Sequence, residues 1–151
     1  ILVTGISDLA SAAQLGTTPT GNGRRQSSRR KAYSRMTNTF FERGADKLED
    51  MIASIQHGYM LFETDNGMED PKNWAIQCVA QYGIEIVDGK LTDNYVSPVV
   101  MSGYVPDLLK SISMISDDFE ISGSGFCGKG YKEWVRVSDG GPALKVRVKL
   151  G

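Results

Sequence analysis

The chain has 151 residues, of which 40% are hydrophobic, and a formal net charge of −1. This composition is typical of a folded domain with a core of ordinary size, and it excludes a disordered or fibrous protein. The longest apolar runs fall far short of the roughly 18 residues that a membrane-spanning helix needs, so we expect no membrane segment.

The basic residues are distributed unevenly. Six of the 17 lie between Arg24 and Arg35, a stretch without any acidic residue, which we call the basic arm. The rest of the chain holds 11 basic and 18 acidic residues and is therefore acidic.

The first quarter of the chain predicts two strands and a helix. Residues 1–4 are an apolar run typical of a strand, and a helix is expected from about residue 8 to 15, with Ser7 as its N-cap and Gly16 as its end. Residues 17–23 are rich in turn formers. Aromatic and β-branched residues then favour a strand over 33–41.

The next segment predicts a helix that Asp46 caps. Its apolar residues recur at helical spacing, and His57-Gly58 would end it, so that His57 would lie at the helix C-terminus. A strand is expected over 59–63 and a loop over 65–71.

The middle of the chain predicts a hairpin. Residues 75–87 and the strand that starts at Lys90 flank Asp88-Gly89, a strong type I′ turn signal. A third strand is expected over 95–101. A helix is expected over 106–115, with Pro106 in its first turn.

The last third predicts strands around a glycine-rich loop. Strands are expected over 119–121, 133–137 and 144–150, with a turn over 138–142 and a loop over 123–130 that carries Cys127. In total, two to three helices among about seven strands predict one α+β domain over residues 1–151. We expect it to be strand-dominated, with a curved antiparallel or barrel-like sheet.

Cys127 is the most conspicuous candidate for chemistry. Flanking glycines allow positive φ angles, so a thiol here could be presented toward a ligand, although a small residue in a glycine turn would look the same. The sequence has one histidine and no other metal-binding motif, so any partners of this thiol would lie outside the chain. Cys78 lies in an alternating apolar run and is interpreted as a core residue. Two cysteines without a disulfide framework favour a reducing, cytoplasmic location.

Four segments, taken in order and spacing, resemble the C-terminal domain of the TldD/PmbA family, also called modulators of DNA gyrase. They are Pro19-Thr-Gly-Asn-Gly-Arg24, Arg35-Met-Thr-Asn-Thr39, Gly125-Phe-Cys-Gly-Lys129 and Val137-Ser-Asp-Gly-Gly-Pro142. The resemblance covers essentially the whole chain.

The resemblance implies a zinc metallopeptidase that acts on unfolded or extended peptides. It implies that Cys127 is one zinc ligand, as in TldD-type subunits. Two histidine ligands and the general base would come from a His-Glu-x-x-x-His segment that this chain lacks. We therefore expect a C-terminal fragment that binds no zinc by itself and is inactive alone. Its expected partners are the missing N-terminal half and a second subunit, as a homodimer or a TldD/PmbA-type heterodimer.

Other residues suggest how a substrate could be held. An extended peptide could lie by strand addition in a cleft. The candidate binding residues are Asn22, Arg24, Arg35, Thr37, Asn38 and Lys129. A mobile basic loop is the plain alternative. A non-catalytic PmbA-like (TldE-like) scaffold is the alternative for the whole chain. Nucleic-acid binding through the basic arm is a more distant one, because no known nucleic-acid motif accompanies the arm.

Overall fold

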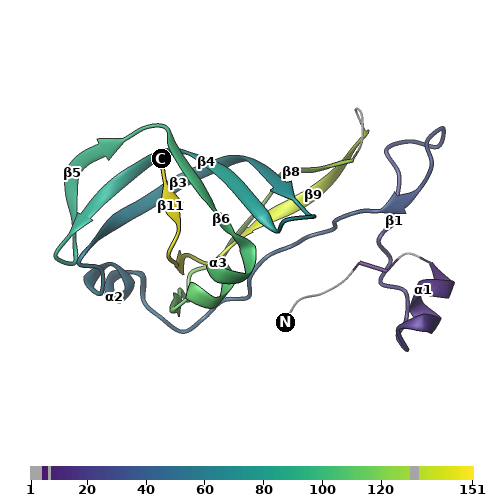
Figure 1. The fold of residues 1–151 in the computed structure, drawn as a ribbon, viewed down its shortest axis with the longest axis horizontal. Helices are drawn as coiled ribbons and strands as arrows, with labels where there is room; N and C mark the ends of the chain where they lie inside the picture. The colour runs from purple at the N-terminus through teal and green to yellow at the C-terminus, as the bar shows by residue number, and fades with distance from the viewer. Residues whose placement is uncertain (1–4, 7, 130–132) are drawn as a thin grey trace. The chain divides into compact units, whose positions relative to one another are not determined.

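The computed structural model describes residues 5–6, 8–129 and 133–151. The helices and strands are labelled in Figure 1, and the chain divides into two compact units. Unit 1 comprises residues 1–42 and 120–141, and unit 2 comprises residues 43–119 and 142–151. The strand expected over residues 1–4 and the expected cap Ser7 lie outside the described residues. That residues 1–151 make a single domain stays a prediction.

Unit 1 begins with the short helix α1, Leu9–Gln14. Asp8 is its N-cap, and the Asp8 carboxylate accepts a hydrogen bond of 2.7 Å from the backbone N–H of Ser11. This bond lowers the pKa of Asp8 below its ordinary value. Gly16 follows the helix with φ of +64°, as expected of a glycine that ends a helix.

The basic arm connects two very short strands. β1, Gly23–Arg24, pairs antiparallel with β2, Tyr33–Ser34. The prediction of a strand over the whole of 33–41 was wrong beyond Ser34. One isolated bridge, between Thr39 and Asp139, is found in the remainder. The Asn22 and Arg24 side chains instead donate hydrogen bonds to backbone carbonyls of this segment. Local strand propensity does not reveal such contacts.

The other half of unit 1 is a hairpin. β8, Glu120–Lys129, pairs antiparallel with β9, Glu133–Gly141, with an irregularity between Ser122 and Gly125. The loop expected over 123–130 was therefore wrong for residues 123–129, which are strand. The turn expected over 138–142 was also wrong, because β9 continues to Gly141. Its last two residues, Gly140 and Gly141, have φ of +144° and +143°.

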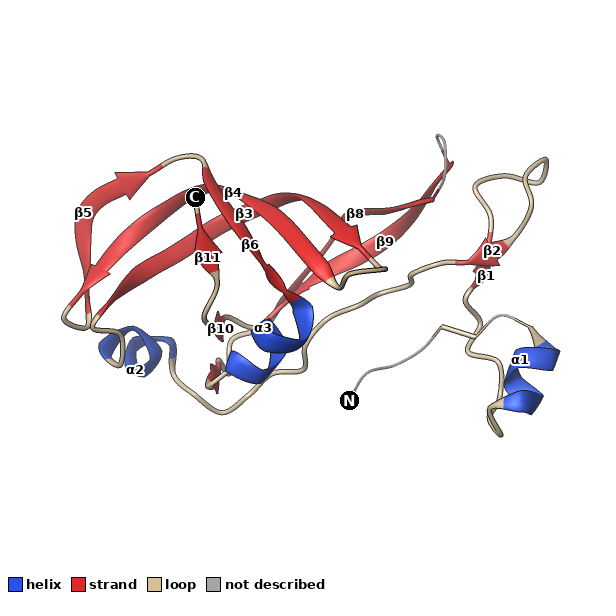
Figure 2. Cartoon of the chain, in the orientation of Figure 1, coloured by secondary structure: helices blue, strands red, loops and turns tan. Residues whose placement is uncertain are grey.

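Unit 2 is built on a five-stranded antiparallel sheet with the order β11-β6-β4-β3, in which β5 also pairs with β4 (Figure 2). The first half of β4 pairs with β6 and the second half with β5, while β3 runs along the other side of β4. The strands are β3 His57–Asp70, β4 Ala75–Val87, β5 Lys90–Val96, β6 Val99–Tyr104 and β11 Lys149–Leu150.

The turn between β4 and β5 is as predicted. Asp88 and Gly89 have φ of +47° and +76°, the left-handed conformations that a type I′ turn requires. The third strand expected over 95–101 was displaced. Pro98, which has no amide hydrogen, separates β5 from β6, and β6 ends at Tyr104.

Two predictions around β3 were wrong. His57 does not end a helix but begins β3, and the loop expected over 65–71 is strand up to Asp70. The pairing with β4 shifts by one residue between Asp65 and Gly67. A bulge therefore accommodates the turn-forming residues, and the strand continues. The chain reverses after Asp70, whose carboxylate accepts hydrogen bonds from Lys72 and Asn73.

The helices of unit 2 are shorter than predicted. α2 spans Leu48–Ala53, and its N-cap is Lys47, which makes no side-chain cap hydrogen bond, so the prediction of an Asp46 cap was wrong. The Asp46 carboxylate accepts a 2.8 Å hydrogen bond from the N–H of Ile115. α3 spans Val105–Ser111 with Pro106 in its first turn, as expected.

The strand expected over 144–150 is divided between two sheets. β10, Leu144–Lys145, pairs with β7, Met114–Ile115, whereas β11 pairs with β6.

The predicted fold class is confirmed. The named strands pair antiparallel, strands outnumber the three described helices, and the sheets stay open; the two isolated bridges are parallel. The most buried apolar residues of unit 2 are Met51, Ala80, Ile86 and Val99. Within the described part of the chain, no helix has the length and apolarity to cross a bilayer.

Candidate functional site

Cys127 lies on β8, directly opposite Val135 of β9. Because side chains alternate along a strand, Cys127 shares one face of the hairpin with Val135 and Val137, which are buried, and with Glu133. The thiol is half-buried and free. The hairpin therefore presents Cys127 on its packed face, and not from a mobile loop.

The glycines around Cys127 serve a different purpose from the one expected. None of Gly123, Gly125 and Gly128 has a positive φ angle. A Cβ at Gly128 would come within 3.0 Å of the Trp134 ring, and one at Gly125 would collide with the Asp139 carboxylate. Gly125 and Gly128 thus leave room for side chains of the neighbouring strand and do not provide a positive φ angle.

Arg35 is the central polar residue of unit 1. Only 3% of its surface is exposed, and its Nη2 donates hydrogen bonds to the carbonyl oxygens of Cys127 and Glu133, the latter at 3.0 Å. Since these carbonyls belong to β8 and β9, one guanidinium joins both strands of the hairpin. Arg35 therefore has a role inside unit 1, and its interpretation as a substrate-binding residue stays a prediction.

Asn22 and Arg24 support the same arrangement. Asn22 Nδ2 donates to the carbonyl of Arg35 at 2.9 Å. Arg24 donates to the carbonyls of Met36 and Arg136 at 2.7 and 2.6 Å. Both side chains therefore hold the segment that follows β2, and Arg24 also holds it to β9.

The remaining candidate residues divide into two kinds. Asn38 is engaged, because its Oδ1 accepts a 3.1 Å hydrogen bond from the N–H of Ser138. Thr37 and Lys129 are exposed. Lys129 Nζ lies 3.4 Å from the carbonyl oxygen of Ser34 and 5.5 Å from the centroid of the Tyr33 ring, a cation–π arrangement. Arg24, Arg35 and Asn38 thus contact the hairpin, which includes Lys129, and Asn22 binds Arg35.

Glu133 was missed by the sequence analysis. Its side chain is 15% exposed, and Arg30 lies 3.9 Å from its Oε1. Among the described residues, Oε2 of Glu133 and Nε and Nη1 of Arg35 are buried without a hydrogen-bond partner. The signal was present, because Glu133 alternates in phase with Val135 and Val137, and a carboxylate on a buried face requires a polar or cationic neighbour.

The opposite face of the hairpin is aromatic and exposed. The Phe126 and Trp134 rings meet edge to face with centroids 6.5 Å apart, and the Arg136 guanidinium lies 5.2 Å from the Phe126 centroid. The Phe126 and Trp134 side chains are about half exposed. This face contrasts with the packed face that carries Cys127.

His57 lies in unit 2 and has a local role. Its Nε2 is 3.1 Å from Oε1 of Glu85, and hydrogen bonds from Asn94 and then His57 lower the pKa of Glu85 below its ordinary value. The described residues contain no group of three or more histidine, cysteine, aspartate or glutamate side chains that could hold a metal. Cys127 therefore fits as one metal ligand at most, with a donor type that zinc prefers.

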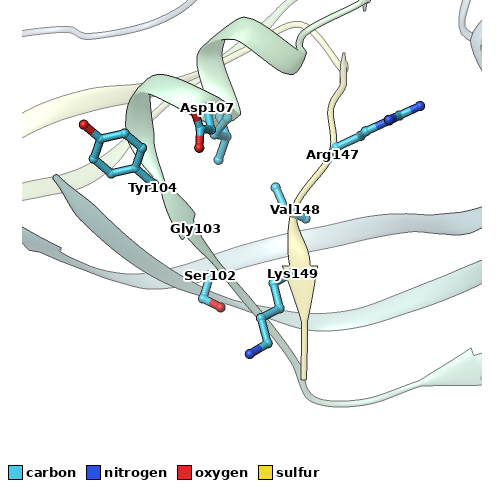
Figure 3. A pocket seen from close by; sticks show the side chains of 8 residues that line it. Ser102, Gly103, Tyr104, Asp107, Arg147, Val148 and Lys149 are labelled. Carbon is cyan, nitrogen blue, oxygen red and sulfur yellow. The ribbon is translucent and has the colours of Figure 1, made fainter.

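Unit 2 also has an open pocket of about 280 Å³ between β6, α3 and the C-terminal segment. Its charged residues are Asp107, Arg147 and Lys149, and the Arg147 and Lys149 side chains point away from one another (Figure 3). None of the candidate residues found from the sequence lines this pocket.

The fold and the site define a strand-dominated α+β chain that presents a free cysteine on an internally braced hairpin. Residues 1–149 match the family model of the PmbA/TldA metallopeptidase C-terminal domain. The chain belongs to this family, and the resemblance found in the sequence is confirmed.

Two relatives illustrate the similarity in sequence. The chain is 36% identical over 147 residues to the zinc metalloprotease TldD homolog of Saccharolobus solfataricus, covering 97% of this chain and 32% of the relative. It is 33% identical over 142 residues to the metalloprotease TldD homolog of Haemophilus influenzae, covering 93% and 29%. The chain thus spans about a third of the length of these relatives.

Solved structures share the fold at lower identity. TldE from Thermococcus kodakarensis superposes with a TM-score of 0.70 at 22% identity, covering 96% of this chain and 30% of that one. A modulator of a DNA gyrase from Thermotoga maritima gives a TM-score of 0.66 at 20% identity, covering 98% and 30%.

Proposed function

We propose that this chain is the C-terminal part of a zinc-dependent peptidase, to which Cys127 contributes one zinc ligand. The observation that carries the proposal is a free thiol on a hairpin whose backbone is held, at that same residue, by a buried arginine. The family description and the names of the related metalloproteases support it.

The other ligands would come from residues outside this chain. A site with two histidines and one cysteine leaves a position open for reaction, which is typical of catalytic zinc. When bound, zinc supplies Lewis-acid activation for amide hydrolysis. The 151 residues alone are accordingly expected to cleave no peptide, and their part is to hold the thiol in place.

The substrate would be an extended peptide. β8 carries Cys127 and pairs only with β9 among the described residues, so a peptide added along its other edge would make main-chain hydrogen bonds whatever its sequence. Thr37 and Lys129 are exposed and would remain available to contact it. Asn22, Arg24, Arg35 and Asn38 would act indirectly, because they shape the backbone.

Metal analysis of the intact protein that carries these residues tests the proposal. Cys127→Ser should lose bound zinc and peptide hydrolysis together. Cys78→Ser is the matched control, since it removes the other free thiol, and it should keep both. Full zinc content in Cys127→Ser would contradict the assignment of the ligand.

The assembly of the intact protein is a separate proposal. We infer either a homodimer or a pair with a TldE-type subunit, and light scattering of the purified protein would distinguish them. The fold does not discriminate a catalytic subunit from a TldE-like scaffold, because TldE has the same fold. An intact protein that holds no zinc with Cys127 unchanged would favour the scaffold.

A further inference from the structure

We propose that Arg35 is a positioning residue for Cys127: its buried guanidinium fixes the main chain at Cys127 and so determines where the thiol lies. The link to zinc rests on the proposed function. The positioning itself does not, because it concerns contacts between residues of this chain.

The geometry places one side-chain atom between the two strands of the hairpin. Arg35 Nη2 donates to Cys127 O on β8 and to Glu133 O on β9, close to the end of the pairing that Lys129 and Glu133 form. Hydrogen bonds from a charged donor are stronger than neutral ones, and burial strengthens them further. Movement of the Cys127 backbone would therefore break a buried, charge-assisted contact.

Arg35 is itself held at its backbone. Its N–H donates to Asn22 O at 2.9 Å, and its carbonyl accepts from Asn22 Nδ2 at 2.9 Å. The next carbonyl, that of Met36, accepts from Arg24 at 2.7 Å. Because the peptide that carries the guanidinium is fixed, its side chain is preorganised toward the hairpin.

The packed face of the hairpin also carries a carboxylate. The Glu133 carboxylate belongs to the face that Cys127 occupies, and it is largely buried. Nε and Nη1 of Arg35 and Oε2 of Glu133 are buried without a hydrogen-bond partner, so the described polar contacts of the Arg35 side chain are the two that Nη2 makes with the hairpin carbonyls. The exposed Arg30, whose guanidinium lies 3.9 Å from the Glu133 carboxylate, provides a natural comparison.

Alkylation of Cys127 in the metal-free intact protein measures the positioning directly. In a Cys78→Ser background, iodoacetamide labelling followed by mass spectrometry reports on Cys127 among the two cysteines of this chain. Arg35→Ala should label roughly tenfold faster or more, because loss of a charged hydrogen bond favours local opening by about that factor. Arg30→Ala should stay within about twofold of the parent, as a surface change away from Cys127.

Arg35→Lys keeps the proposal testable if Arg35→Ala does not fold. A lysine keeps the charge but lacks the planar fork, so it should fold and show an intermediate labelling rate. Unchanged labelling in folded Arg35→Ala or Arg35→Lys, or an equal increase in Arg30→Ala, would overturn the proposal.

Zinc affinity, measured by chelator competition, gives the second readout. Arg35→Ala should weaken zinc binding roughly 10- to 100-fold, as is typical when a group that orients a ligand is removed. If the parent binds no zinc while the labelling rates differ as expected, the proposed function fails and the positioning role stands. If zinc affinity in Arg35→Ala equals that of the parent, the positioning role fails and the proposed function stands.

Discussion

Asn22 and Arg35 are joined by two hydrogen bonds of 2.9 Å, although they lie 13 residues apart in the sequence. One bond runs from the Arg35 N–H to the Asn22 carbonyl, and the other from the Asn22 side-chain amide to the Arg35 carbonyl. The Asn22 Oδ1 also accepts a hydrogen bond from the Thr20 hydroxyl. The single Asn22 side chain thus closes the base of the basic arm and fixes the residue that braces the hairpin.

Replacing Asn22 with alanine should therefore destabilise unit 1. The Arg35 carbonyl would lose its side-chain donor, which typically costs about 1–2 kcal/mol when the group is partly buried. Urea unfolding should show a lower midpoint at an unchanged slope. Thr37→Ala is the control, because Thr37 is exposed and its loss should change stability by less than about 0.5 kcal/mol. Equal midpoints for Asn22→Ala and the parent would argue against the role assigned to Asn22.

The Asp88-Gly89 turn makes a second prediction. Gly89 has φ of +76°, and a Cβ there would lie 2.7 Å from the Ala53 carbonyl oxygen. Gly89→Ala should therefore lose about 1–3 kcal/mol of stability through backbone strain and crowding. Gly103→Ala is a matched control, since its added Cβ meets nothing within 4 Å. Thermal unfolding of the two variants should separate them clearly, and similar melting temperatures would refute the strain argument.

Asp88 and Gly89 also show what the sequence could predict about the fold. The Asp88-Gly89 turn is local, because two residues that tolerate positive φ suffice to specify it. The loop expected over 65–71 begins with similar residues, Asp65-Asn-Gly67, yet the chain continues there as β3. The long pairing with β4 prevails over local preference, and a one-residue bulge accommodates it. Pairing with distant residues is not visible in a local pattern.

The sequence analysis named residues that the structure places close to one another, but it did not show which groups they bind. Asn22, Arg24, Arg35 and Asn38 do gather around the hairpin that carries Cys127, yet their polar atoms bind backbone groups. An exposed arginine and a buried one look alike in a basic run. The contact of Arg35 with the carbonyl of Cys127, 92 residues away in the sequence, distinguishes the buried arginine.

Cys78 should titrate at higher pH than an ordinary thiol. Burial, and then the charge of Glu69, raise the pKa of Cys78 above the ordinary value of 9.0. Because the folded state holds this proton more tightly, the contribution to stability is full below 9.0 and is lost as pH rises through the folded pKa. In a Cys127→Ser background, the pH profile of alkylation should have its midpoint above 9.0.

Glu69→Gln provides the control for this titration. Removing the negative charge should move the midpoint down toward the ordinary value, while the part caused by burial remains. A midpoint of alkylation at or below pH 9.0 in the Cys127→Ser protein that keeps Glu69 would contradict the assignment of a half-buried environment to Cys78.

Gly128→Ala should disturb the aromatic face of the hairpin more than its stability. The added Cβ would come within 3.0 Å of the Trp134 ring, which is half exposed and can move aside. The edge-to-face contact with Phe126 should weaken, and near-ultraviolet circular dichroism in a Trp74→Phe background should report it. Gly123→Ala, where nothing lies within 4 Å of the added Cβ, should leave the spectrum unchanged. Identical spectra for both variants would contradict the crowding at Gly128.

The division of unit 1 into two sequence segments has a consequence for biosynthesis. Arg35 and Cys127 are separated by 92 residues, and most of unit 2 is encoded between them. At roughly 5–20 residues per second, the ribosome needs about 5–20 s to supply the partner of Arg35. During that interval the guanidinium has no hairpin to bind, so the cysteine-bearing half of unit 1 is completed only after residues 43–119 have been made.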